Sequence, residues 1–175
     1  NGMSSLIQAF NASYHIRENK SILKQQVLSI VLTLILSGLV FITILLIIFG
    51  KITVNYLIEF QYINSNEIFI LNGAKWIILI TMLFFGITTI FNLGSAISGK
   101  IKIFSSGAIL ATIFIILTSI GFSYYIDNFS QYNKIYGSIG TLMIILLWMY
   151  FNAIILLTGF ELNASINNAK NQLKT

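Results

Sequence analysis

The chain has 175 residues, of which 57% are hydrophobic and only 9% are charged, and its mean hydropathy is +0.88. Soluble domains carry about 25% charged residues, so this composition excludes an ordinary water-soluble domain. The absence of cysteine excludes disulfides, thiolate nucleophiles and cysteine-bound zinc. The net charge of +5 comes from basic residues dispersed between apolar runs, which is not the basic surface of a nucleic-acid-binding protein.

The first predicted element is an amphipathic helix over residues 3–24. Leu6, Phe10 and Tyr14 recur every four residues and form an apolar stripe, and charged residues close the segment. We expect residues 1–26 to form a cytoplasmic or interfacial helix. It either lies on the membrane surface or ends an earlier membrane helix.

Four apolar runs follow, and each is long enough to cross a bilayer. They cover residues 27–48, 76–93, 104–126 and 138–160. Helices of this length measure about 27–35 Å, and the hydrocarbon core of a bilayer is about 30 Å thick. The predicted fold class is therefore all-α, a polytopic transmembrane helical bundle with four spanning helices plus the N-terminal amphipathic helix. Residues 1–175 then form a single integral membrane domain, and the lipid bilayer is its expected partner.

The distribution of basic residues between the runs predicts orientation. Seven lie on one predicted side of the membrane and three on the other: Arg17, Lys20, Lys24, Lys100, Lys102, Lys170 and Lys174 against Lys51, Lys75 and Lys134. Because cytoplasmic loops carry the excess of lysine and arginine, both termini are expected in the cytoplasm. Residues 49–75 then form an outer loop, which can include a short interfacial helix.

The third run carries small residues on one face of its predicted helix. Gly107, Ala111, Thr118 and Gly121 share this face, whereas Leu117 lies on the side expected to contact lipid. Small residues let membrane helices approach closely. A connection of only about ten residues favours the fourth run as the antiparallel neighbour.

The fourth run has a matching face. If its helix is continuous, Glu161 points to nearly the opposite side from a face that is shared by Gly137, Thr141, Trp148, Asn152, Gly159 and Asn163. We expect Asn152 to bond across to another helix, because an unpaired amide is costly in lipid. It serves either as a packing contact or as a contact to a substrate.

Ionisable residues at membrane depth are candidates for function. Glu161 ends the fourth run, and it either serves a site or anchors to the interface or to a neighbouring helix. Asp127 ends the third run and suits a helix-terminal turn. His15 is the only histidine, and the five acidic residues are scattered, so no metal site and no catalytic residue is predicted.

The second half of the chain carries an ordered set of short motifs. They are Gly107-Ala108, Gly121-Phe122-Ser123, Asn128-Phe129, Tyr136-Gly137-Ser138-Ile139-Gly140 and Gly159-Phe160-Glu161-Leu162-Asn163. Together they resemble the BrkB/YihY family of bacterial inner-membrane proteins, and the resemblance covers nearly the whole chain. It implies a six-helix domain with both termini cytoplasmic, of which this chain holds the last four helices, with sequence missing before Asn1. The family has proline before Gly107, where this chain has Ser106.

Some members of that family carry a ribonuclease label, which the residues here argue against. Phosphodiester hydrolysis needs a metal or paired acid–base groups, and RNA binding needs a basic surface. We therefore expect no enzyme activity, no cofactor and no nucleic-acid partner. One interpretation is a transport or lipid-handling role, with the polar stripes lining a cavity. The alternative is a structural or assembly subunit whose stripes only pack helices. The substrate and the oligomeric state, including a homo-oligomer, stay open.

Overall fold

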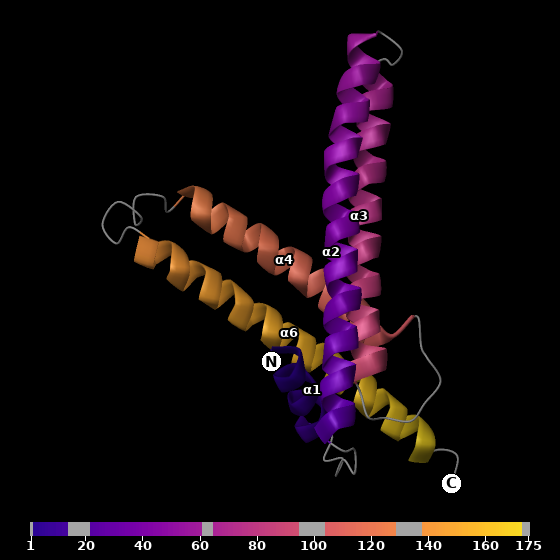
Figure 1. The fold of residues 1–175 in the computed structure, drawn as a ribbon, viewed down its shortest axis with the longest axis vertical. Helices are drawn as coiled ribbons and strands as arrows, with labels where there is room; N and C mark the ends of the chain where they lie inside the picture. Colours follow the sequence, from indigo (N-terminus) through magenta and orange to yellow (C-terminus); the bar gives the residue numbers. More distant parts are fainter. Residues whose placement is uncertain (1, 14–21, 61–64, 95–103, 129–137, 173–175) are drawn as a thin grey trace. The chain divides into compact units, whose positions relative to one another are not determined.

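The computed structural model describes residues 2–13, 22–60, 65–94, 104–128 and 138–172, and these are helical apart from a few residues at helix ends. The helices are α1 (Gly2–Ser13), α2 (Ile22–Glu59), α3 (Ser65–Gly94), α4 (Ser106–Asn128) and α6 (Ser138–Gln172) (Figure 1). All but α1 are long and apolar enough to cross a membrane. The predicted fold class, with four spanning helices and an additional N-terminal helix, is confirmed.

The described helices divide into two compact units. The start of α1 belongs with α2 and α3, and the rest of α1 belongs with α4 and α6. Each unit contains one antiparallel pair of long helices (Figure 1). Because backbone groups in a bilayer must be satisfied within the chain, a pair of continuous helices suits these apolar runs.

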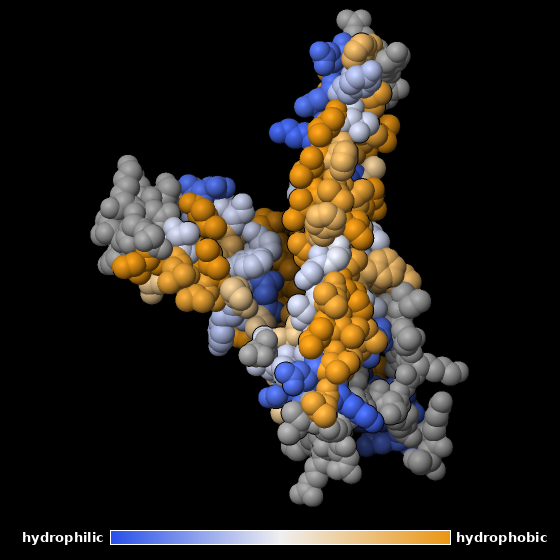
Figure 2. All heavy atoms as spheres, viewed as in Figure 1, coloured by the Kyte–Doolittle hydropathy of each residue, from blue (hydrophilic) through white to orange (hydrophobic). Residues whose placement is uncertain are grey.

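The first unit is the α2–α3 hairpin. The Cα of Gly86 in α3 faces α2, where a Cβ would lie 3.7 and 3.8 Å from the side chains of Leu36 and Leu39. One helical turn farther along, Thr43 Oγ1 lies 3.2 Å from Met82 Sδ and donates a 2.7 Å hydrogen bond to the Leu39 carbonyl. Hydrophobic side chains cover most of the visible surface of this hairpin (Figure 2).

Helices α2 and α3 are longer than the apolar runs that predicted them. Residues 49–75 were expected to form an outer loop, but the described parts of this segment, 49–60 and 65–75, are helical except at residue 60. The difference has a physical reason. Isolated charges such as Lys51 and Lys75 interrupt an apolar run without ending a helix, and the segment contains no proline.

The second unit is the α4–α6 pair together with part of α1. Phe10 of α1 is fully buried and stacks on Phe160 of α6, with ring centroids 4.2 Å apart. The helix predicted over residues 3–24 is therefore helical to Ser13 and docks an aromatic ring onto α6. Residues 22–24 belong instead to α2, and Tyr14 and His15 lie outside the described residues. An apolar stripe alone does not distinguish a helix that packs on protein from one that lies on lipid.

Candidate functional site

Helices α4 and α6 come into backbone contact at Gly107 and Gly159. A Cβ built on Gly107 would collide with the carbonyl oxygen of Gly159 and would lie 2.7 Å from Cγ of Asn163. Gly107 and Gly159 are both buried. Any side chain at position 107 would therefore push the two helices apart, so glycine is required here by space rather than by backbone conformation.

Asn163 of α6 caps the beginning of α4. Its Oδ1 accepts a 2.8 Å hydrogen bond from the backbone N–H of Gly107, and its Nδ2 donates to Ser105 Oγ at 3.0 Å. Ser105 Oγ also accepts from the N–H of Ala108 at 3.3 Å, and the Ser105 carbonyl accepts from the N–H of Ile109 at 3.1 Å. The first N–H groups of a helix lack partners within it, so these two side chains satisfy donors that would otherwise be costly to bury. We call Ser105, Gly107, Gly159 and Asn163 the capping cluster.

The small-residue face continues from the capping cluster along α4. Ala108 and Ala111 are completely buried. Thr112 is also buried, and its hydroxyl donates a 2.7 Å hydrogen bond to the Ala108 carbonyl within the same helix. The first half of the predicted small-residue face is thus closely packed and dry.

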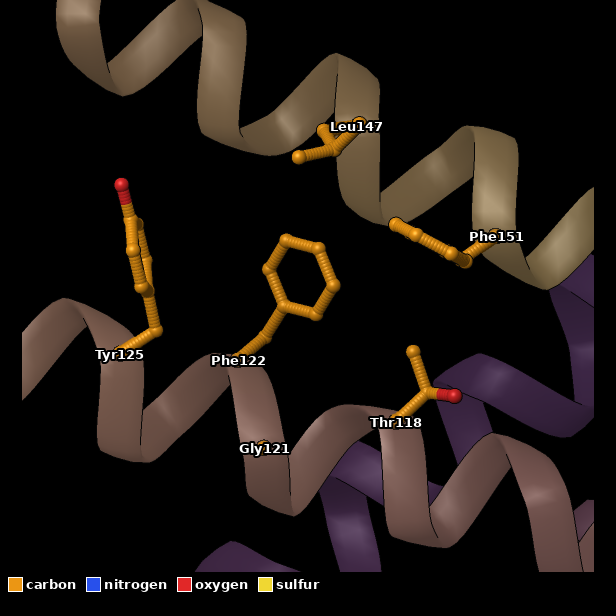
Figure 3. Close-up of a pocket in the computed structure, with 6 residues that line it drawn as sticks. All are labelled: Thr118, Gly121, Phe122, Tyr125, Leu147 and Phe151. Carbon is orange, nitrogen blue, oxygen red and sulfur yellow. The ribbon is translucent and has the colours of Figure 1, made fainter.

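Farther along, a groove of about 330 Å³ lies between α4 and α6 (Figure 3). Its lining consists of Thr118, Gly121, Phe122, Tyr125, Leu147 and Phe151. Phe122 points from α4 toward α6, and its ring meets that of Phe151 edge-on at a centroid separation of 5.9 Å. We call this space the α4–α6 groove.

The groove corrects the expectation that Gly121 packs tightly against the fourth helix. No described atom beyond its own helix backbone and chain neighbours lies within 4 Å of a Cβ built on Gly121. The bulky ring of the adjacent Phe122 projects between the helices at this level (Figure 3). A helical wheel places Gly121 on the correct side of α4 but does not register that a neighbouring ring keeps the backbones separated.

Asn152 also departs from its prediction. Its Nδ2 donates a 2.7 Å hydrogen bond to the carbonyl of Trp148, one turn earlier in the same helix. The nearest acceptor for this amide is therefore in α6 itself, because the neighbouring backbone of α4 has no unpaired helix end at that level.

The remaining sequence candidates lie apart from both features. Glu161 and Asp127 have exposed side chains and belong neither to the capping cluster nor to the groove lining. Gly140 is buried in the first turn of α6, and Gly137 lies outside the described residues. Among the described residues, no three histidine, cysteine, aspartate or glutamate side chains form a group that could hold a metal ion.

The structure also assigns roles to residues that the sequence did not single out. Ser105 directly precedes α4, and a serine at that position is a recognised helix-start signal. Leu147 and Phe151 of α6 line the groove. They carried no signal of their own, because apolar residues in an apolar helix look alike whether they face lipid, protein or a groove.

Comparison with known proteins gives a family for the whole chain. The family model described as Virulence factor BrkB matches residues 1–175. The chain is 27% identical over 172 residues to the ribonuclease-like protein YfkH of Bacillus subtilis, covering 97% of this chain and 62% of that protein. A UPF0761 membrane protein of Haemophilus influenzae strain Rd is 34% identical over 104 residues, which are 58% of this chain and 39% of the relative.

A shorter match with higher identity is to a UPF0761 membrane protein of Alteromonas mediterranea, at 43% identity over 63 residues, which are 36% of this chain and 21% of the relative. The chain thus spans less than two thirds of the length of these relatives. No solved structure matches it significantly. The helices, their apolar character and the match along all 175 residues agree, and the chain belongs to the BrkB family of bacterial membrane proteins.

Proposed function

We propose that this chain is part of a bacterial inner-membrane protein that binds and moves a membrane lipid. The observation that carries the proposal is the α4–α6 groove, which lies between two membrane-spanning helices and is lined almost wholly by apolar side chains. A polar solute would lose its hydration in such a groove without gaining hydrogen bonds. A lipid-soluble substrate has no hydration shell to lose, so the lining favours lipid handling over transport of a polar solute.

The contrast between the capping cluster and the groove favours a lipid-handling role over a role in helix packing alone. Backbone contact at Gly107 and Gly159 fixes the two helices together at one level. About 21 Å along α4 from Gly107, the helices are separated at Gly121 by the groove. The same helix pair therefore combines a tight crossing with open space that a lipid chain can occupy. The buried face around Ala108 and Ala111 is the part of α4 that packs the helices together.

The orientation belongs to the same proposal. Both termini are placed in the cytoplasm, because seven of the ten basic residues then lie on the cytoplasmic side. No enzyme activity is assigned. The ribonuclease-like name belongs to YfkH, whereas the five acidic residues of this chain, at positions 18, 59, 67, 127 and 161, are scattered along the sequence.

The test is movement of a fluorescent phospholipid across the bilayer of liposomes that contain the purified full-length protein. We expect quenching of inner-leaflet lipid by an external reductant to proceed faster than in protein-free liposomes. Gly121→Phe, which fills the groove, should slow this movement, and Leu117→Phe, on a side chain 57% exposed, should not. A rate equal to that of protein-free liposomes would contradict the proposal.

A further inference from the structure

The α4–α6 groove is large enough for part of one lipid acyl chain but too small for a whole lipid molecule. Its residues on α4 run from Thr118 to Tyr125, which is about 10 Å along the helix axis. Its volume of about 330 Å³ lies at the lower end of the roughly 300–1,000 Å³ typical of small-molecule sites. A slender hydrocarbon chain fits this length and volume, whereas a lipid head group together with its chains does not.

The groove lies beside exposed apolar side chains of the same two helices. On α4, Leu117 and Ile120 alternate with the lining residues and are exposed, and on α6 the same holds for Leu146 and Tyr150. These side chains belong to helices long and apolar enough to span a membrane, and the exposed side chains of such helices contact lipid hydrocarbon. The molecules available to the edge of the groove from the bilayer are lipid acyl chains.

The groove is held open by aromatic rings. The Phe122 ring is braced edge-on against Phe151, and the Tyr125 ring projects from the next turn of α4 toward α6 (Figure 3). Transfer of a chain from the bilayer into protein brings no hydrophobic gain, because lipid tails are as apolar as leucine. Retention then depends on dispersion contacts with a preformed wall, and rigid aromatic rings provide such a wall.

One end of the groove is polar, which gives the bound chain a direction. The Tyr125 hydroxyl lies in the last turn of α4, and the exposed Asp127 follows. Tyrosine is enriched at the level of lipid head groups. The opposite end, at Thr118, leads toward the closely packed face around Thr112. A chain therefore enters with its ester end near Tyr125 and its methyl end toward Thr118.

We propose that the α4–α6 groove binds one acyl chain of a phospholipid, which enters sideways from the bilayer and packs against Phe122. This inference rests on the proposed lipid-moving function, since it names the part of the lipid that the groove holds. Beyond that function, the inference names the binding site, the direction of the acyl chain within it, and Phe122 as the residue whose ring forms its wall.

The experiment uses the full-length protein in phosphatidylcholine vesicles that contain a phospholipid with a photoactivatable diazirine near the end of one acyl chain. After irradiation, labelled peptides are mapped by mass spectrometry. We expect labelling at 118–125 of α4 and 147–151 of α6 to exceed that at exposed positions such as Phe41. In Gly121→Phe, groove labelling should fall about tenfold, which corresponds to about 1.4 kcal/mol.

Gly121→Phe is suited to this test because no described atom outside its own helix backbone and chain neighbours lies within 4 Å of a Cβ at that position. Leu117→Phe adds the same ring to the exposed side of α4 and should leave groove labelling unchanged. Equal labelling in wild type and Gly121→Phe would overturn the inference.

The two proposals fail in distinguishable ways. Lipid movement with no preferential labelling of the groove would contradict the acyl-chain site and leave the proposed function standing. Preferential labelling that Gly121→Phe abolishes, in a protein that moves no lipid between leaflets, would support the site and contradict the proposed function.

Discussion

The side chain of Asn163 in α6 completes the first turn of α4 by accepting a 2.8 Å hydrogen bond from the backbone N–H of Gly107. An amide on one spanning helix thus supplies a cap that helices usually obtain from a residue of their own chain segment. The bond requires the helix axes to be close, and only glycine at position 107 permits that approach. Packing and hydrogen bonding at this crossing therefore depend on each other.

Gly107→Ala should destabilise the protein by about 1–3 kcal/mol, because the added methyl group collides with the Gly159 carbonyl and the backbones must separate. Thermal unfolding in detergent measures the effect. Gly121→Ala is the matched control, since its methyl group enters open space, and replacing a helical glycine with alanine is otherwise favourable by about 0.5–1 kcal/mol. A larger loss of stability for Gly121→Ala than for Gly107→Ala would refute the described crossing.

Ser105→Ala removes the N-cap of α4 and should lower the free energy of unfolding by about 0.5–2 kcal/mol. Asn163→Ala leaves the backbone N–H of Gly107 without its acceptor and should lower it by about 1–3 kcal/mol. Because the two side chains share a 3.0 Å hydrogen bond, the double variant should lose less stability than the two single variants added together. Ser106→Ala changes the exposed neighbouring hydroxyl and serves as the control. Strict additivity would show that Ser105 and Asn163 do not act as one unit.

Phe10→Ala should destabilise the protein by about 3–5 kcal/mol, the usual cost of removing a buried aromatic ring. Phe10 is fully buried and stacks on Phe160 at 4.2 Å. The same change at Phe41, whose side chain is 61% exposed on α2, should have little effect in detergent. If the two variants melt at the same temperature, α1 is not docked on α6 through this ring.

Topology reporters fused at Gln61 and after Thr175 should give opposite signals. The seven-to-three distribution of basic residues predicts an external reporter at Gln61 and a cytoplasmic reporter at the C-terminus. Activity of paired alkaline phosphatase and green fluorescent protein fusions distinguishes the two sides. A cytoplasmic signal at Gln61 would reverse the proposed orientation.

Hydropathy predicted which segments are membrane helices but not where they end. An apolar run stops at its first charge, as before Lys51, whereas a helix stops where its backbone hydrogen bonding stops. This is why α2 continues to Glu59 although its predicted run ended at residue 48. Membrane insertion depends on side-chain hydropathy, which is read directly from the sequence. Helix continuation depends on backbone hydrogen bonding, which hydropathy does not report.

The candidate site was predicted in part. Asn152 and Asn163 fall on the same predicted face of α6, yet only Asn163 reaches a neighbouring helix. The decisive difference is their level along α4: Asn163 lies beside the unpaired N–H groups at the start of that helix, and Asn152 does not. A helical wheel gives the angle of a residue around its own axis, but it omits the axial position of the partner helix, and with it the groove beside Gly121.

The length of α2 has a consequence for how the protein sits in membranes of different thickness. Its 38 residues span about 57 Å, and a tilt of about 40°, the upper end for spanning helices, would still leave about 44 Å along the bilayer normal against about 30 Å of hydrocarbon. The Thr43–Met82 contact aligns the turn of α2 that contains Lys51 with the turn of α3 that contains Lys75. Helix α2 then continues for about 12 Å from Lys51 to Glu59. The α2–α3 hairpin can therefore accommodate hydrophobic mismatch by sliding or tilting, because helical backbone continues on both sides of the lysine level.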